Sequence, residues 1–265
     1  MKKLRTYIMY LLEYLKHKDF RSIYAAANYL LFKKSHSKDR VIQTSVGKFY
    51  CRKGTNDFQF ANFHYEWGVK KYVLTHKQEY NVFIDGGSCI GEYCILLSKY
   101  NVRCIAFEPI QGNFDVLAKN LELNNLSEKV LAFSCGLGDK NTTMNFVYNP
   151  VNTGASHLAT TSCENDCQSQ IRTFDSLLPE LGLKTSDRIL FKLDVEGMEL
   201  EALKGATQFI HQFPQITFIM EDKHTGKENI MKLLNDIAKF EIGMVDEFNI
   251  FAKKIENKPS KISPL

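Results

Sequence analysis

Hydrophobic residues change their spacing repeatedly along the chain from residue 81 onward. Short apolar runs, typical of strands, alternate with stretches in which apolar residues recur every three or four positions, typical of helices. The runs predict five strands, at 82–85, 102–107, 129–135, 188–194 and 215–221. The helical stretches cover residues 91–100, 111–124, 198–212 and 226–239. This alternation predicts an α/β fold in which helices cover both faces of a parallel sheet.

The pattern differs at the C-terminal end of the chain. Two short strand-like runs, around 240–245 and 248–253, are joined by a polar turn. They predict a terminal hairpin, so that the last of seven strands runs antiparallel to the others. We assign residues 81–255 to one domain and residues 256–265 to a flexible C-terminal tail.

A basic segment, residues 1–40, lies before this domain. Its apolar residues have helical spacing on both sides of a break at 17–19, which predicts a pair of helices. The segment holds ten lysines and arginines against three acids, or +7, so the rest of the chain carries −3 of the total of +4. Its apolar runs are far shorter than the ~20 residues that span a bilayer, and charged residues interrupt any signal-peptide pattern. Three interpretations stay open: a helical cap, a homodimer contact, and peripheral contact with an acidic membrane surface.

Residues 41–80 connect the basic segment to the domain. Small strands are expected around Gly47 and Gly54. A helix is expected from Tyr65 to His76. Farther along the chain, the polar stretch 149–167 is expected to be a loop that takes part in choosing the substrate.

Charge and cysteine content narrow the classes of function. A slightly acidic body with one basic arm is poorly suited to binding nucleic acid, which needs a basic face. The seven cysteines lack the spacing of a disulfide scaffold, which indicates reduced thiols in a reducing compartment such as the cytoplasm. Cys163 and Cys167, with three residues between them in a polar loop, are candidates for redox activity or metal binding, but no second pair or histidine cluster completes a zinc site. We therefore assign no metal ligands.

The stretch NVFIDGGSCIGEY places a glycine turn between the first strand and the first helix of the domain. A dinucleotide fingerprint that starts at Gly86 would need glycine at the position of Ser88. The chain instead has Asp85, Gly87 and Gly91 at a different spacing. A carboxylate at this turn can hold a cationic amino group and would repel a phosphate. The turn therefore favours a nucleoside that carries an amino acid over one that carries a pyrophosphate.

Two further strand ends carry candidate binding residues. Glu108 and Pro109 end the second strand, 23 residues after Asp85. An acid at about this distance accepts hydrogen bonds from ribose hydroxyls in doubly wound nucleotide sites, although it could also be an exposed charge at a strand end. Cys135 and Gly136 end the third strand, where the edge of an adenine would lie.

The fourth strand ends in the sequence FKLDVEG, which brings a lysine and two acids to one strand end. Substrates of open α/β sheets bind outside the carboxyl ends of the strands. Charges beside an apolar strand are costly unless they are functional or paired. Asp194 and Glu196 are therefore candidate catalytic residues, whereas Lys192 could simply neutralise one of them.

Five blocks of sequence, in this order, resemble the FkbM family of methyltransferases that depend on S-adenosyl-L-methionine (AdoMet). They are IDGGSCIGEY, AFEP, GASHL, IRTFDSLL and FKLDVEGMELEALKGA, within residues 65–253. The resemblance implies a Rossmann-like class I methyltransferase fold with a mostly parallel seven-stranded sheet. It also implies methylation of a hydroxyl on a sugar, a glycan or a related natural product.

The resemblance assigns roles to the candidate residues. It places the glycine turn on the methionine side of AdoMet, Glu108 on the ribose, and Asp194 and Glu196 toward the transferred methyl group. The family usually has alanine and asparagine where this chain has Ser88 and Cys89, which leaves the contacts of that asparagine in question. The basic segment has no counterpart in the family core.

A sugar hydroxyl is a poor nucleophile while it is protonated, so a nearby base should assist the reaction. Asp194 is the first candidate for this base, Glu196 the second and His224 the third. A divalent metal held by Asp194 with Glu196, or by the acids at 221–222, is an alternative way to acidify the hydroxyl.

Two other functions are compatible with parts of the pattern. An NAD-dependent oxidoreductase would use the same sheet, but Ser88 and the terminal hairpin count against it. A non-catalytic nucleotide-fold module that organises a membrane-associated partner would account for the basic segment. Such a module needs no cofactor site, so the presence of Asp85, Glu108 and Asp194 together counts against it. We therefore favour a methyltransferase with a small-molecule or glycan acceptor.

Overall fold

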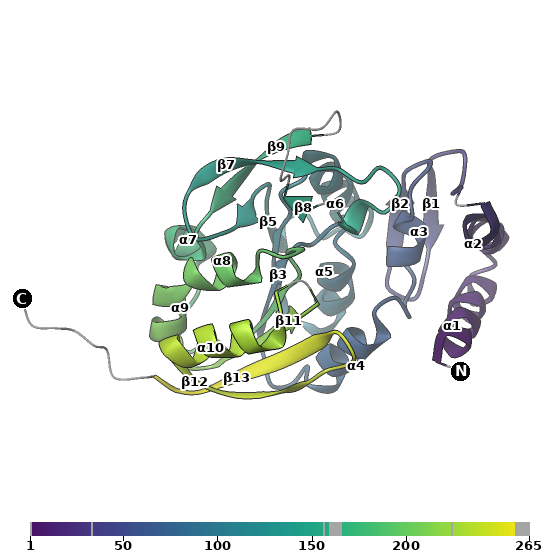
Figure 1. Ribbon diagram of the computed structural model, residues 1–265. Coiled ribbons are helices and arrows are strands. Elements are labelled where there is room, and N and C mark those ends of the chain that lie inside the picture. Colours follow the sequence, from purple (N-terminus) through teal and green to yellow (C-terminus); the bar gives the residue numbers. More distant parts are fainter. Residues whose placement is uncertain (1, 33, 156, 159–165, 224, 258–265) are drawn as a thin grey trace, which may run out of the picture.

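The computed structural model (Figure 1) describes residues 2–32, 34–155, 157–158, 166–223 and 225–257. Its centre is a seven-stranded sheet with the order β12-β13-β11-β10-β3-β4-β5. The parallel strands are β3 (Val82–Gly86), β4 (Arg103–Phe107), β5 (Val130–Phe133), β10 (Ile189–Leu193) and β11 (Ile216–Glu221). The terminal hairpin consists of β12 (Ala238–Met244) and β13 (Asn249–Asn257), and β13 runs antiparallel to β11. The predicted fold class and its antiparallel last strand are confirmed.

Helices cover both faces of this sheet, because its strands are apolar on both sides. In β3, Phe83 packs into one hydrophobic cluster, whereas Val82 and Ile84 pack into another. The first cluster includes side chains from α4 (Trp67–Thr75), α5 (Glu92–Leu97) and α6 (Gln111–Leu123), and η1 (Ser98–Tyr100) follows α5. The second includes side chains from α7 (Phe174–Leu181), α8 (Glu199–Lys204), α9 (Thr207–Gln212) and α10 (Lys227–Ile237).

The single helix expected at 198–212 is two helices, α8 and α9, and that prediction was wrong. A Cβ atom on Gly205 would lie 1.9 Å from the carbonyl oxygen of Gly138, so the chain approaches another backbone closely between the two helices. Asp175 then accepts hydrogen bonds from the backbone N–H groups of Gln208 and Phe209 at the start of α9, both at 2.9 Å. A side chain distant in sequence thus starts the second helix.

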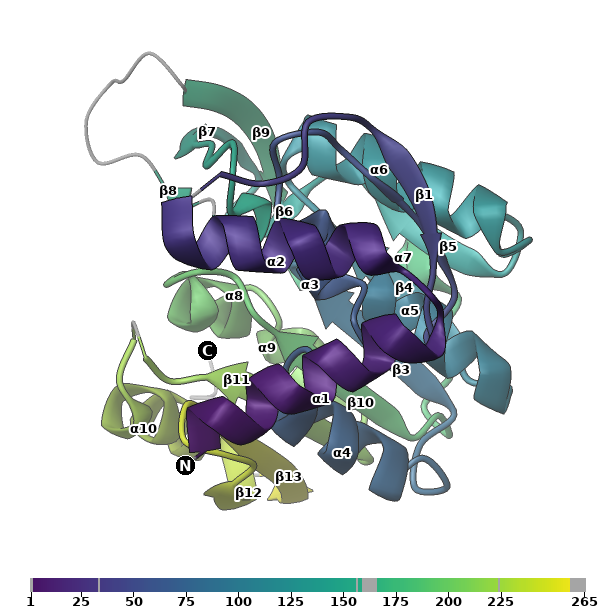
Figure 2. The ribbon, with the colours of Figure 1, turned by 90° about the vertical axis from the view of Figure 1, so that its right-hand side faces the viewer.

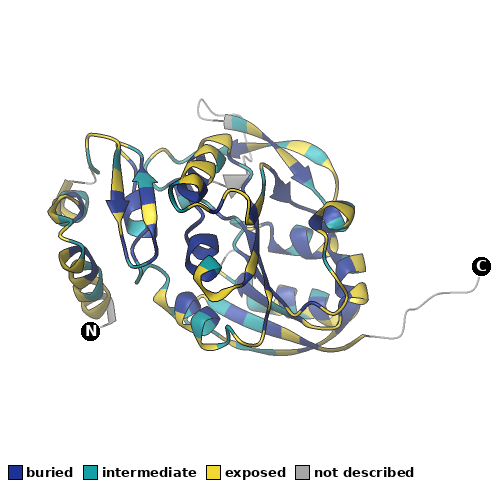
Figure 3. Cartoon of the chain, turned by 180° about the vertical axis from the view of Figure 1, so that it is seen from behind, coloured by how far each residue is buried: buried dark blue, intermediate teal, exposed yellow. Residues whose placement is uncertain are grey.

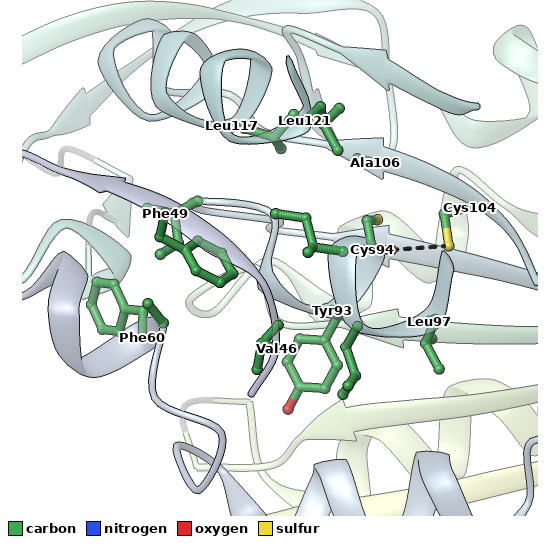
Figure 4. Close-up of a cluster of buried hydrophobic side chains, with 14 of the residues drawn as sticks. Val46, Phe49, Phe60, Tyr93, Cys94, Leu97, Cys104, Ala106, Leu117 and Leu121 are labelled. Atoms are coloured by element: carbon green, nitrogen blue, oxygen red, sulfur yellow. Dashed lines mark hydrogen bonds between the residues drawn. The ribbon is translucent and has the colours of Figure 1, made fainter. Parts of the chain in front are cut away.

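A small hairpin joins the N-terminal part of the chain to the domain. It consists of β1 (Arg40–Gln43) and β2 (Lys48–Cys51), which pair around Gly47 as expected. A small strand was also expected around Gly54, but a short helix, α3 (Asp57–Phe60), follows this glycine instead. Phe49 of β2, Phe60 of α3 and Tyr93 of α5 all belong to the first hydrophobic cluster, part of which is drawn in Figure 4. The hairpin therefore shares its core with the large sheet.

The predicted helix pair at the N-terminus is confirmed as α1 (Lys2–Lys16) and α2 (Phe20–Phe32). Figure 2 shows both helices as an outer layer over the rest of the molecule. The break between them contains Lys18, whose φ of 55° ends the first helix. Among the described residues, no helix has both the length and the apolar character needed to cross a bilayer.

A second sheet, formed by residues between β5 and β10, was not predicted. It has four strands in the order β6-β9-β7-β8, namely β6 (Gly136–Leu137), β7 (Thr142–Val147), β8 (His157–Leu158) and β9 (Asp166–Arg172), with η2 (Thr153–Ala155) before β8. Only one residue of β7, Phe146, is buried, so its sequence contains no apolar run. Part of the expected loop at 149–167 is therefore strand. Cys167 lies in β9 rather than in a loop, and Cys163 lies outside the described residues.

Candidate functional site

The glycine turn after β3 lies directly against the end of β10. Gly87 has a φ of 87° and Gly91 a φ of 82°, backbone conformations that residues with a side chain rarely adopt. A Cβ atom on Gly87 would lie 1.9 Å from the carbonyl oxygen of Asp194. The backbone N–H of Asp194 in turn donates to the carbonyl of Gly86 at 2.9 Å. Pairing of β3 with β10 thus brings the turn and Asp194 together.

Cys89 occupies the part of the turn in which the chain departs from the usual family sequence. Its φ of 46° lies in the left-handed region, which asparagine adopts more readily than most residues with a side chain. Its backbone N–H donates to Oε2 of Glu108 at 2.9 Å. Cys89 therefore has a backbone conformation that asparagine would also adopt.

Glu108 is buried at the end of β4, so the alternative of an exposed charge is wrong. Oε1 accepts hydrogen bonds from the backbone N–H of Ile110 at 2.9 Å and from Nδ2 of Asn113 at 3.3 Å. Burial raises the pKa of Glu108 to about 7, even though these hydrogen bonds favour the charged form. The carboxylate is held in a fixed position beside the turn.

Asp85 and Ser88 have different surroundings, although both lie in the turn. The hydroxyl of Ser88 donates to the carbonyl of Asp85 at 2.8 Å and accepts from the N–H of Phe107 at 3.2 Å, so it ties β3 to β4. Both carboxylate oxygens of Asp85 are buried with no hydrogen-bond partner among the described residues. Burial raises the pKa of Asp85 to about 6. A buried carboxylate without a hydrogen bond is costly, and the positive charge of Lys192 offsets part of that cost. Asp85 itself lines neither of the two cavities at this end of the sheet.

A first cavity lies at the carboxyl ends of β3, β4 and β10. Its wall is formed by Gly87 and Cys89 of the turn, by 108–110, by 136–137 and by 194–196, together with further residues. Pro109 and Gly136 therefore line the cavity, as predicted for neighbours of a cofactor. Cys135 does not line it: this side chain packs into the second hydrophobic cluster, where burial raises the pKa of the thiol to about 11.

A second cavity adjoins the first and shares part of its wall. The shared residues include Gly87, Cys89, Asp194 and Glu196. The charged side chains around the second cavity are mainly acidic. The acids are Glu66, Glu92, Asp194, Glu196 and Glu221, and the bases are Lys192 and Lys223. The ammonium of Lys192 donates to Oδ2 of Asp194 at 2.8 Å, so the predicted pairing of these two residues is present.

Burial and mutual repulsion shift the pKa values of these groups. Burial first, and then the charges of neighbouring acids, raises the pKa of Glu196 to about 7 and that of Glu221 to about 7. Burial opposes the charge of Lys192, but Asp194 and other nearby acids outweigh burial and raise its pKa. The second cavity therefore has carboxyl groups that exchange protons near neutral pH.

These shifts predict that acid stabilises the folded protein. Asp85, Glu108, Glu196 and Glu221 have folded-state pKa values of about 6, 7, 7 and 7, above the ordinary values of 3.8 and 4.5. The folded protein therefore binds more protons than the unfolded chain between these values, and the resulting stabilisation is lost as the pH rises through about 7. We expect the urea midpoint to fall between about pH 5 and about pH 8.

Glu221→Gln should make this fall in stability shallower, because one group with a raised pKa is removed. Glu122→Gln changes an exposed glutamate of α6 in the same way and should leave the slope unchanged. A urea midpoint that rises over this pH range, or equal slopes in both variants, would contradict the assignment.

Two acids of the second cavity were missed by the sequence analysis. Glu92 is buried in the first turn of α5, where it is the one charged residue of an apolar helix, EYCILL, and this contrast could have identified it. Glu66 accepts a hydrogen bond from the hydroxyl of Tyr93 at 2.9 Å, and nothing in its local sequence points to the cavity. His224 lies outside the described residues. Within the described part of the chain, no group of three or more His, Cys, Asp or Glu is arranged to hold a metal ion.

Comparison with known proteins identifies the family. The sequence model of the family described as "Methyltransferase FkbM domain" matches residues 85–244. "Hexuronic acid methyltransferase AglP" of Haloferax volcanii is 30% identical over 174 residues, which cover 64% of this chain and 68% of that protein. "Methyltransferase sdnD" of Sordaria araneosa is 28% identical over 187 residues, 53% of this chain and 71% of that protein.

Among solved structures, the methyltransferase FkbM from Methylobacillus flagellatus KT superposes with a TM-score of 0.47 at 18% identity. The match covers 66% of this chain and 44% of that chain, so this protein spans less than half of its length.

The first cavity fits AdoMet, the cofactor of these methyltransferases. Glu108 lies in its wall, where its carboxylate can accept hydrogen bonds from ribose hydroxyls, and Gly87, Pro109 and Gly136 border the cavity without long side chains. The family match spans more than half of the chain. This protein therefore belongs to the FkbM family of AdoMet-dependent methyltransferases.

Proposed function

We propose that this methyltransferase methylates a hydroxyl of a sugar, a glycan or a related natural product. The observation that carries the proposal is the second cavity, which adjoins the first and is lined mainly by carboxylates. Carboxylates accept hydrogen bonds from hydroxyl groups, and an acceptor rich in hydroxyls can satisfy several of them at once. The relative named for hexuronic acid supports a sugar acceptor.

The charge of the second cavity supports a neutral acceptor. Five carboxylates and two lysines line it, and one of these lysines, Lys192, is already paired with Asp194. The carboxylate of a uronic acid would add another negative charge to a site whose acids already raise one another's pKa values. We therefore propose that a neutral sugar hydroxyl is preferred over a hexuronic acid.

We propose that the residues around the glycine turn hold the cofactor. AdoMet supplies a methyl group that its sulfonium already activates. Gly86, Gly87 and Gly91 would let the backbone approach the methionine part, and Asp85 would meet its amino group. Glu108 would accept hydrogen bonds from the ribose hydroxyls. Pro109 and Gly136 would border the nucleoside, whereas Ser88 and Cys135 would support the wall from behind.

We propose that Glu196 accepts the proton of the acceptor hydroxyl and that Asp194 orients the site. A general base works best when its pKa lies near the working pH, and the pKa of Glu196 is about 7. Its φ of 50° is unusual for a residue with a side chain, and such strain is concentrated at functional sites. Asp194 is held in an ion pair with Lys192 at 2.8 Å, which suits an orienting role. This reverses the order of the two residues that the sequence favoured.

Calorimetric titration with S-adenosylhomocysteine tests the cofactor site. We expect Glu108→Ala to bind about 100-fold more weakly than the wild type, because hydrogen bonds to a charged group are lost. Glu122→Ala removes an exposed carboxylate from α6 and should bind as the wild type does. NAD, titrated in parallel, should not bind. Equal affinity in Glu108→Ala and the wild type would exclude Glu108 from the site.

Transfer of a labelled methyl group from AdoMet tests the acceptor class. Neutral hexoses and the matching hexuronic acids are offered as free sugars and as glycosides. The neutral compounds should have the higher kcat/KM. Labelling of the uronic acids alone would overturn the preference for a neutral acceptor. The cofactor assignment would stand, because S-adenosylhomocysteine binding is measured separately.

We also propose that the enzyme works in the cytoplasm, at the surface of a membrane. The free thiols of Cys51, Cys89, Cys94, Cys104 and Cys135 support a reducing compartment. Contact of residues 1–40 with a membrane is one proposal for this segment, and a homodimer contact is its competitor.

A further inference from the structure

The apolar stripe of α1 faces away from the protein. Leu4 is 65% exposed and Leu12 is 54% exposed, and the other members of the stripe are also exposed: Tyr7, Ile8, Leu11 and Leu15. The opposite side of the helix holds the buried residues Glu13 and Tyr14. An amphipathic helix that caps a core buries its apolar side, so α1 is not a helical cap of this kind.

The second helix continues the same exposed surface. Its large exposed side chains are Phe20, Tyr24, Leu30, Leu31 and Phe32. Figure 3 shows exposed residues along much of both helices, at the end of the molecule that bears the N-terminus. Single exposed apolar residues are normal, but a contiguous apolar surface marks a site of interaction. We call this surface, formed by the exposed apolar side chains of α1 and α2, the outer apolar face.

The charges beside the outer apolar face are basic, because the acids in and between α1 and α2, Glu13 and Asp19, point inward. The third acid of residues 1–40, Asp39, lies beyond α2 and accepts a hydrogen bond from the hydroxyl of Tyr50. Glu13 accepts hydrogen bonds from the N–H and hydroxyl of Ser45 at 2.7 and 3.0 Å. Asp19 forms an ion pair with Arg40 at 2.8 Å. In contrast, Arg5 and Arg21 are exposed on α1 and α2. The exposed side of the helix pair therefore combines apolar surface with positive charge.

We propose that the outer apolar face lies on an anionic lipid bilayer. Helices that lie in the plane of a membrane surface bury an apolar face and place basic side chains against acidic headgroups. A second copy of this chain would bring the same positive charges against each other, which disfavours it as the occupant.

The helix pair is fixed to the segment that borders the second cavity. The hydroxyl of Tyr14 donates to the carbonyl of Phe58 at 3.3 Å, and Nδ2 of Asn62 donates to the carbonyl of Tyr10 at 3.3 Å. Phe60 and Glu66, which flank Asn62 in sequence, line the second cavity. If the proposed function holds, a bilayer under α1 and α2 would lie beside the acceptor site and would suit an acceptor attached to lipid. Contact with the bilayer itself does not depend on that function.

Vesicle flotation of the full chain tests this proposal. The protein should float with vesicles of phosphatidylcholine and phosphatidylglycerol, float poorly with phosphatidylcholine alone, and be released by added salt. Leu12→Asp should weaken binding at least about tenfold, because an apolar contact with the bilayer is replaced by a charge that the lipid repels. Arg21→Gln should weaken it about fivefold.

Ile255→Asp is the matched control, because Ile255 is 51% exposed near the C-terminal end of β13, which lies across the molecule from α1 (Figure 1). It should float as the wild type does, and all variants should keep their affinity for S-adenosylhomocysteine. Equal flotation of Leu12→Asp and the wild type would overturn the proposal. The proposal would also be overturned if the wild type did not bind the anionic vesicles and instead sedimented as a dimer that Leu12→Asp dissociates. That result would identify a second copy as the occupant.

Discussion

Replacing Gly87 by alanine is expected to lower the free energy of unfolding by about 3 kcal/mol or more, or Tm by roughly 10 °C. Two causes act together. The φ of 87° is strained for any residue with a side chain, and the new Cβ would lie 1.9 Å from the carbonyl oxygen of Asp194. Since that oxygen belongs to the backbone of the site, β3 and β10 would have to separate at their carboxyl ends. Any folded variant should also lose affinity for S-adenosylhomocysteine.

Gly54→Ala separates these two causes. Gly54 has a φ of 77°, but a Cβ atom there would meet no heavy atom within 4 Å. Only the backbone strain applies, and the expected loss is about 1 kcal/mol, or roughly 3 °C in Tm, with unchanged affinity for the cofactor product. Thermal unfolding and calorimetry of both variants provide the comparison. Equal losses at the two positions would mean that contact with Asp194 does not constrain the turn.

Glu196→Gln is expected to lower kcat by a factor of roughly 10² to 10⁴ at neutral pH, the usual contribution of a general base. The affinity for S-adenosylhomocysteine should change little, because the substitution removes a charge and keeps the shape. In the wild type, kcat should rise with pH through about 7, since the carboxyl must lose its proton before it can act as a base. Glu196→Gln should abolish this rise.

Two further variants identify the base. Glu201→Gln makes the same change on α8, where the side chain is half-buried and its Oε1 lies 3.9 Å from Nζ of Lys204, and kcat should stay unchanged. Asp194→Asn removes a negative charge that raises the pKa of Glu196. It should therefore shift the pH profile toward lower pH. If Asp194→Asn instead loses turnover entirely while Glu196→Gln keeps it, Asp194 is the base, as the sequence alone had suggested.

The edge that carries the site could be predicted from the sequence for a simple reason. Parallel strands end at a common edge, so Asp85, Glu108 and Asp194, which each follow an apolar run, had to come close together. The register confirms this: Gly86 pairs with Leu193 on one side and with Phe107 on the other. Strand positions inferred from local spacing were enough to predict this edge, because adjacent parallel strands place their carboxyl ends side by side.

Other parts of the site depend on packing between distant segments. Glu66 and Glu92 border the same cavity although they lie on different elements. The sequence could not show that the pKa of Glu196 is raised to about 7, since the cause is burial together with Asp194 and Glu221. For this reason we propose Glu196 ahead of Asp194 as the base.

The sequence by itself determined the fold class, the antiparallel last strand and the strand ends that form the cofactor cavity. These features follow from spacing along the chain, which reports whether a residue lies on an apolar face. Only the tertiary structure decided what each face meets. The apolar stripe that begins at Leu4 is visible in the sequence. The sequence around it does not indicate whether the stripe packs on the core or faces solvent. That choice depends on long-range contacts such as those of Glu13 with Ser45 and Tyr14 with Phe58, which hold the other side of α1 against the protein.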